Sequence, residues 1–218
     1  MQIEFDKDYL RELYQTGKTS DKKHRFQPQV IKGYKKAIDV LKISRRIEDL
    51  FPFKGLNFEV LQGDKSGLCS VRANGQYRVE FKVSTMDDEQ IITICLILEL
   101  SNHYNKQKQD MSNIYNPYDL EPFEPTHPGE LLGDELEARG LTQRKFAETI
   151  GISCSVLNEV IKGKRPVTPE LAFKIEAATG TKAYIWVELQ TQYNYWTAKK
   201  SKKLSVLLDQ IRKSVAVL

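Results

Sequence analysis

The chain has 218 residues, a formal net charge of +4 at pH 7 and 40% hydrophobic residues, a composition typical of a globular protein large enough for two cores. Its longest apolar run, residues 91–98, is too short to cross a bilayer, and the N-terminus lacks a signal-peptide core. The cysteines are odd in number and form no Cys-x-x-Cys pair, which favours reduced thiols over disulfides or a zinc site. We therefore expect a cytoplasmic protein that contacts no membrane and holds no metal.

The first hundred residues predict an α+β domain with two helices against an antiparallel sheet. In chain order we expect an edge strand (2–5), a short helix (6–15), a long helix (about 28–50) and four strands (56–61, 68–73, 76–83 and 91–98). Apolar side chains recur along the long helix at helical spacing, at Val30, Ile31, Tyr34, Ala37, Ile38, Leu41 and Ile47. The pair Asn74-Gly75 between two of the strands is a strong hairpin signal.

Segment 55–81, GLNFEVLQGDKSGLCSVRANGQYRVEF, resembles the centre of HigB toxins, which belong to the RelE/YoeB superfamily of messenger-RNA interferases. Members share the turn L-x-G-x-x-x-G, matched by Leu61, Gly63 and Gly67, and an arginine on the following hairpin strand, matched by Arg78. The resemblance covers about residues 1–105. It implies a RelE-like fold and a ribosome-dependent endoribonuclease that acts on messenger RNA and needs no cofactor.

RNA cleavage of this kind proceeds by attack of the 2′-hydroxyl group, which needs a base, cations beside the phosphorane and an acid for the leaving 5′-oxygen. Arg72 and Arg78 lie on either side of the predicted hairpin turn, so both can point to one face of the sheet and hold the scissile phosphate. The alternative interpretation is a pair of solvated charges on an exposed sheet face.

The other catalytic candidates follow from the resemblance. Glu59 stands where YoeB-like relatives have a glutamate general base, and His103 with Tyr104 resembles a terminal histidine-tyrosine pair that would supply the acid. Lys65 and Lys54 would steer the RNA. Taken alone, Glu59 and His103 are also typical of ordinary surface residues.

Two positions depart from the family pattern. Gln62 replaces a lysine that is usual at this place, and Cys69 replaces a tryptophan that is common after the turn. They leave open a second hypothesis, a transcription regulator whose N-terminal domain has lost catalysis and serves as a surface for a partner. A small-molecule enzyme is not indicated, because the sequence has no Gly-rich phosphate loop, metal-ligand spacing or Ser/Cys nucleophile constellation.

A Pro- and Asn-rich stretch, residues 109–124, predicts a linker between a first domain (1–108) and a second (125–218). The charge changes sign after it, since residues 111–138 carry seven acidic and no basic side chains, whereas residues 139–218 carry fourteen basic and six acidic ones. This asymmetry predicts one surface for a basic partner and another for phosphate. We expect the acidic arm, residues 119–137, to lie on the basic face of the first domain. The alternative is that the charges are unevenly distributed over the surface by chance.

Residues 125–165 predict the helices of a helix-turn-helix DNA reader. Thr142 is a good N-cap for one helix, Gly151 supplies the positive φ of the turn, and Ser153 caps a second helix that ends at Gly163. The side chains that we expect to be buried are Leu141, Phe146, Ala147, Ile150, Ile152, Val156, Leu157, Val160 and Ile161.

The open face of the second helix is the predicted DNA contact, because a recognition helix places its N-terminal side chains against base edges in the major groove. The candidates there are Ser153, Cys154, Ser155 and Asn158, of which the last could pair with adenine. The candidates for phosphate contacts are Gln143, Lys162, Lys164 and Arg165. A helical hairpin that binds no DNA is the alternative.

Residues 125–196 also resemble HigA-type antitoxins of the Xre helix-turn-helix class. The shared pattern includes the HPGE opening, the G-L-T-Q turn, the TPELA segment and W-x-x-L-Q-x-x-Y. The resemblance implies a homodimer that binds a palindromic operator and represses its own operon. Beyond residue 196, apolar side chains recur at helical spacing and predict an amphipathic last helix. We expect its apolar stripe to be covered by its own domain core or by a dimer partner. The stripe consists of Leu204, Leu207, Leu208, Ile211, Val215 and Leu218.

A toxin-like domain followed by an antitoxin-like domain predicts a contact between the two halves of one chain. Covalent linkage raises the effective concentration of each half for the other to roughly millimolar. We therefore expect a self-neutralised complex that binds operator DNA while its nuclease is masked.

Overall fold

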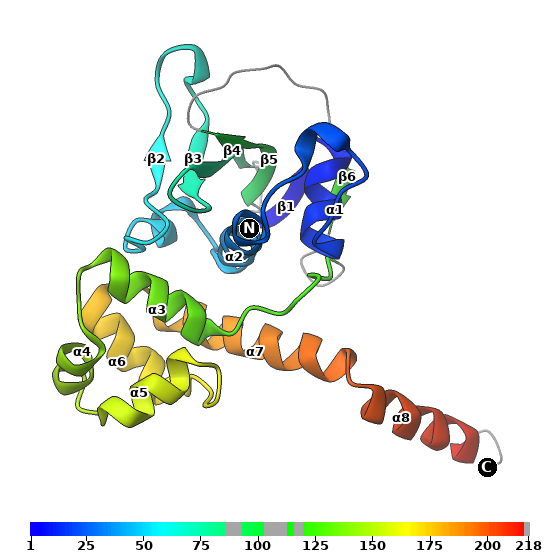
Figure 1. The fold of residues 1–218 in the computed structure, drawn as a ribbon, viewed down its shortest axis with the longest axis vertical. Helices are drawn as coiled ribbons and strands as arrows, with labels where there is room; N and C mark the ends of the chain where they lie inside the picture. Colours follow the sequence, from blue (N-terminus) through cyan, green and yellow to red (C-terminus); the bar gives the residue numbers. More distant parts are fainter. Residues whose placement is uncertain (86–92, 103–112, 116–119, 216–218) are drawn as a thin grey trace.

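The computed structural model describes residues 1–85, 93–102, 113–115 and 120–215. The N-terminal half is a sheet with helices packed against it, which confirms the predicted α+β class (Figure 1). Its elements are β1 (Gln2–Phe5), α1 (Asp8–Thr16), α2 (Pro28–Ile43), β2 (Glu59–Val60), β3 (Cys69–Arg72), β4 (Tyr77–Thr85), β5 (Thr93–Asn102) and β6 (Asn113–Tyr115), with short 3₁₀ turns at Lys22–His24, Ile47–Leu50 and Gly63–Lys65.

The strands of the described residues form one mixed sheet in the order β2-β3-β4-β5-β1-β6. β1 runs parallel to β5, and β6 runs antiparallel to β1. The sequence indicated that β1 is an edge strand, but it lies inside the sheet. Residues 113–115, which belong to the predicted linker, pair with its outer side and satisfy the backbone groups that an edge would expose.

Helix α2 lies directly against the β3–β4 turn. A Cβ atom at Gly33 would stand 1.9 Å from the carbonyl oxygen of Ala73, so only glycine permits this approach. Of the apolar side chains predicted for its buried side, all are buried except Ile47, which is partly buried. The helix ends at Ile43, earlier than about residue 50, because Ser44 takes extended backbone angles and a separate 3₁₀ turn follows.

The C-terminal half is all helical and consists of α3 (Pro128–Ala138), α4 (Gln143–Thr149), α5 (Cys154–Ile161), α6 (Pro169–Thr179), α7 (Ala183–Lys199) and α8 (Lys202–Val215). The predicted caps are confirmed, since the Thr142 hydroxyl accepts the N–H of Lys145 and the Ser153 hydroxyl accepts the N–H of Val156, each at 3.2 Å. Gly151 has a φ of +66°. These contacts fix α4 and α5 as a helix-turn-helix pair.

The two halves touch along α2, which lies between the sheet on one side and α3 on the other (Figure 1). Helix α7 also packs against α2. Helix α8 continues from the end of α7 and extends away from the body of the molecule (Figure 1). None of the helices in the part of the chain that the structure describes is long and apolar enough to span a membrane.

Candidate functional sites

The β3–β4 hairpin brings the two candidate phosphate-binding arginines together. Arg72 and Arg78 are paired directly across the strands, and Ser70 and Glu80 form the next pair on the same face. The turn is held by Asn74, whose side-chain oxygen accepts two backbone N–H groups at 2.9 and 2.8 Å. The expectation that both arginines share one face of the sheet is confirmed.

Arg78 is far more buried than its place on an open sheet face indicates, with only 7% of its surface exposed. Its Nε donates to the Ser70 hydroxyl at 2.9 Å, and its Nη2 donates to the carbonyl oxygens of Asn57 at 2.6 Å and Ser70 at 3.3 Å. Burial lowers the pKa of the guanidinium, and the Glu59 carboxylate opposes this effect. A phosphate would have to displace some of these protein partners.

Glu59 lies at the start of the edge strand β2 and is the ion-pair partner of Arg78, with 3.3 Å between Oε2 and Nη2. Asn57 donates its side-chain N–H to the same carboxylate at 2.8 Å. This asparagine has a φ of +42°, so the chain turns there, and β2 is shorter than the strand predicted over residues 56–61. The candidate base and the candidate phosphate ligand are therefore held by one residue.

Lys65 contacts the same face through Glu80, a residue that sequence reasoning missed. The Nζ of Lys65 lies 2.5 and 2.6 Å from the two carboxylate oxygens of Glu80, and the Ser101 hydroxyl donates to one of them. Glu80 follows Arg78 by two residues on one strand, so the period-two alternation of a strand was a signal that could have found it.

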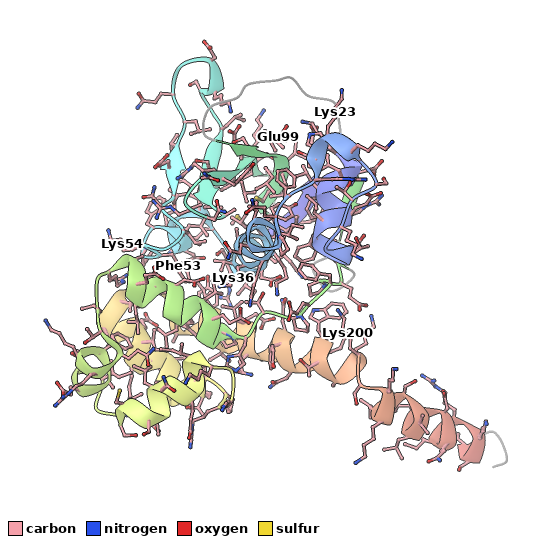
Figure 2. The ribbon with its side chains drawn as sticks, in the orientation of Figure 1. Lys23, Lys36, Phe53, Lys54, Glu99 and Lys200 are labelled. Atoms are coloured by element: carbon pink, nitrogen blue, oxygen red, sulfur yellow. The ribbon has the colours of Figure 1, made fainter. Side chains whose placement is uncertain are left out.

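His103 and Tyr104, the predicted acid pair, lie outside the described residues. The described part of this half contains His24, which was not among the predicted site residues. Its ring stacks on Tyr9 with 3.8 Å between ring centroids, and its Nδ1 lies 2.6 Å from Asp21. The Tyr9 hydroxyl in turn donates to Glu99, which lies on the side of the half away from α3 (Figure 2). Such long-range stacking leaves no local pattern in a sequence.

An open cleft of about 950 Å³ lies between the two halves, beside Arg72. One wall is α2 with Lys32 and Lys36, a second is the hairpin, and the third is α3, whose lining includes the acidic residues Asp134, Glu135 and Glu137. An ion pair crosses it at 2.5 Å between Lys36 and Asp134, and a second pair joins Lys32 to Glu130 of α3 at 3.0 Å. Part of the acidic arm thus faces the lysines of α2 and the side of the hairpin that carries Arg72.

The end of the predicted linker and the first residues of the second domain, residues 120–127, are fixed on α2 by buried charges. Lys35 and Lys42 donate to backbone carbonyl oxygens of this segment at 2.7 and 3.1 Å, and Asp39 accepts the hydroxyl of Thr126. Burial lowers the pKa of both lysines, while the charge of Asp39 raises it. The segment is therefore a packed part of the contact between the halves.

A second group of contacts joins α7 to the loop that precedes β2. The Tyr184 hydroxyl donates to the Asp49 carboxylate, and the Phe53 ring lies 5.7 Å from the Trp186 ring. Phe53 is 2% exposed. Its place at the junction of the halves, beside Lys54, can be followed in Figure 2. An aromatic anchor of this kind is typical of a specific interface.

The predicted DNA contacts gather on one surface of the C-terminal half. Ser153, Cys154 and Ser155 are exposed at the start of α5, and the Asn158 amide donates to the side-chain oxygen of Gln143 at 3.0 Å. Three cationic side chains that follow α5 are also exposed, those of Lys162, Lys164 and Arg165. The last of these pairs with Glu159 at 2.8 Å. Polar side chains at the start of a helix, with cations just after its end, suit a helix that lies in a major groove.

Helix α8 buries none of its described side chains, so the expectation that its own domain core covers the apolar stripe is wrong. Leu207 and Ile211 are each 49% exposed. The physical reason is that Lys200 ends α7 and α8 then leads away from the bundle (Figure 1). Leu218 lies outside the described residues.

Two protein families match the chain in succession. The model of the RelE-like toxin of the type II toxin-antitoxin system HigB matches residues 3–96, and a helix-turn-helix model matches residues 132–186. Toxin HigB-1 of Vibrio cholerae is 34% identical over 38% of this chain and 83% of that protein. Antitoxin HigA-1 of the same organism is 32% identical over 39% of this chain and 90% of that protein.

Among solved structures, a putative antidote protein of a plasmid maintenance system from Nostoc punctiforme is 32% identical, with a TM-score of 0.37 over 40% of this chain and 96% of that chain.

Proposed function

The chain belongs to the HigB toxin family in its N-terminal half and to the HigA antitoxin family in its C-terminal half, and we propose that it is a self-neutralised, cytoplasmic toxin–antitoxin unit. The N-terminal half is a latent endoribonuclease that cleaves messenger RNA on the ribosome without a metal. The C-terminal half restrains that nuclease and represses transcription from its own operator.

The nuclease assignment is carried by one observation, the gathering of two carboxylates and three cations around one sheet face. Glu59 would take the proton of the attacking 2′-hydroxyl, while Arg78 and Arg72 hold the scissile phosphate and Lys65 guides the strand. Charged groups that are already oriented by protein contacts stabilise a phosphorane more effectively than flexible ones. The acid remains a proposal for His103 with Tyr104.

Restraint by the C-terminal half is supported by the charge on the cleft walls. The α3 wall beside Arg72 carries carboxylates, which repel the phosphates of an incoming RNA. The lysines of α2, which would otherwise attract that RNA, already have carboxylate partners on α3.

Operator binding is supported by the capped α4–α5 pair and its surface of polar and basic side chains. We place Ser155 and Asn158 against base edges and Lys162 and Lys164 against phosphates. A homodimer would bind a palindromic site, and the apolar face of α8 is the surface that we assign to the dimer contact.

The test compares the full chain with a chain that ends before residue 111. In cell-free translation, the shortened chain is expected to cut the message, and added residues 111–218 are expected to suppress the cut; in cells, the shortened chain should arrest growth. A shortened chain that also carries Arg72→Ala and Arg78→Ala is the control and should leave the message intact. An intact message from a folded shortened chain would instead indicate a regulator with an inactive toxin-like domain.

A further inference from the structure

The loop from Pro52 to Asn57 connects the contact between the halves with the candidate catalytic face. On the antitoxin side it is held by Glu135, which is 1% exposed and accepts the backbone N–H groups of Lys54 at 3.0 Å and Gly55 at 2.9 Å. These are charge-assisted hydrogen bonds in a buried position, and such bonds are stronger than bonds between neutral groups. Helix α3 thus binds the backbone of the loop.

Arg139, the residue that caps the end of α3, lies four residues after Glu135 and binds the same loop; we call the pair Glu135 and Arg139 the clamp. Its Nε donates to the Glu135 carboxylate at 2.6 Å, and its Nη2 donates to the carbonyl oxygen of Pro52 at 2.6 Å. The same nitrogen donates to the carbonyl oxygen of Thr179, at the end of α6. One ion pair therefore holds the N–H groups and a carbonyl group of a loop of the other half.

At its other end the loop holds the candidate catalytic pair. The carbonyl oxygen of Asn57 accepts from Arg78, and its amide donates to Glu59. The preceding carbonyl oxygen, of Leu56, accepts the backbone N–H of Arg72 at 2.6 Å. Asn57 is only two residues from Gly55, a span of at most about 7 Å. A shift of the clamped backbone must therefore move the groups that hold Arg78 and Glu59.

We propose that Asn57 is a positioning residue through which the antitoxin half keeps Arg78 and Glu59 paired with each other. This inference rests on the proposed nuclease. In the paired state the Nη2 group of Arg78 donates to Asn57 and faces Glu59, so it is not free to bind a phosphate. Loosening the clamp frees these donors. Neutralisation then acts through the backbone of one loop, in addition to the acidic wall of the cleft.

The test uses the full chain and follows the Nη protons of Arg78 by nuclear magnetic resonance. Nη2 makes the contacts to Asn57 and Glu59, so the rate at which its protons exchange with water reports on the pairing. Glu135→Gln replaces one acceptor oxygen with an NH2 group that opposes the donors of the loop and of Arg139. We expect exchange to become about tenfold faster or more. The matched control is Glu130→Gln on the same helix, which loses an ion pair to Lys32 of α2 and leaves the loop clamped.

A double-mutant cycle assigns the coupling to Asn57. Asn57→Gly keeps the positive φ and removes the amide that binds Glu59, so it should also speed exchange at Arg78. If the clamp acts through this residue, adding Glu135→Gln to Asn57→Gly should change the rate little further. Additive effects of the two substitutions would overturn the role of the Asn57 amide, because both chains keep the backbone carbonyl of residue 57 that accepts from Arg78.

A second clamp variant keeps the test independent of one substitution. Arg139→Gln loses the bond to Pro52 and should act in the same direction as Glu135→Gln, while retained operator binding shows that the C-terminal half is folded. Unchanged exchange in both folded variants would overturn the coupling, even if the shortened chain cleaves the message. Faster exchange without any message cleavage, by these variants or by the shortened chain, would support the coupling and count against the proposed nuclease.

Discussion

Tyr184 illustrates at the scale of one residue how the two halves are held together. Its hydroxyl donates to the Asp49 carboxylate, and burial together with this hydrogen bond raises its pKa to about 12. An unfolded tyrosine has a pKa of about 10, so the folded chain binds more protons between these two values. The stabilisation is therefore fully present below about pH 10 and is lost as the pH rises through about 12.

We expect Tyr184→Phe to lower the free energy of unfolding by about 0.5–1 kcal/mol near neutral pH, a small value because the side chain is partly exposed. The difference from the native chain should shrink above about pH 10, where the unfolded phenol ionises. Urea unfolding of both chains at neutral and alkaline pH measures this. A difference that stays constant with pH would mean that the hydroxyl does not contribute through its proton.

Single residues also show where sequence reasoning ends. The pairing of Arg72 with Arg78 was predictable because Asn74-Gly75 fixes the register of a hairpin through local geometry. The burial of Arg78 was not, because it depends on Asn57, which approaches from a loop 21 residues away. The place of Glu80 was predictable, since the alternation of side chains along a strand puts residues 78 and 80 on the same face of the sheet.

At the scale of elements, the approach of α2 to the hairpin depends on Gly33. Alanine normally stabilises a helix interior by about 1 kcal/mol relative to glycine. Here its Cβ would meet the carbonyl oxygen of Ala73 at 1.9 Å, so we expect Gly33→Ala to destabilise the chain by about 1–3 kcal/mol instead. Gly75→Ala is the control, because a Cβ at that position meets open space. Denaturant midpoints measure both, and a stabilising Gly33→Ala would contradict the packing.

Elements were predictable where their causes are local. Thr142, Ser153 and Gly151 cap and turn the helix-turn-helix pair through bonds that span three residues or fewer, so the sequence was sufficient. The place of β1 inside the sheet was not predictable, because its second neighbour comes from residues 113–115, more than a hundred positions along the chain. Whether the molecule covers the apolar stripe of α8 likewise depends on the direction of the chain after Lys200, and the spacing of apolar residues does not encode that direction.

At the scale of the whole molecule, the proposed dimer connects the exposed amphipathic helix with the surface suited to DNA. Helix α8 presents apolar side chains on one face, at Leu204, Leu207, Leu208, Ile211 and Val215, and none of them is buried within the described chain. A second copy of the chain would bring a second α5 to the DNA, as a palindromic operator requires. Dimerisation through α8 would therefore couple the apolar face to operator affinity.

We expect Leu207→Glu with Ile211→Glu to make the chain monomeric, because two carboxylates on the apolar face oppose its burial. Operator affinity should fall by about 10²-fold or more, since each half-site is then bound without the other. Ser205→Glu with Gln210→Glu adds the same charge on α8 outside the apolar stripe and should change neither property. Analytical ultracentrifugation and operator titration measure the two effects. A variant that stays dimeric would assign the dimer contact to another surface, whereas a monomer that keeps full affinity would separate dimerisation from repression.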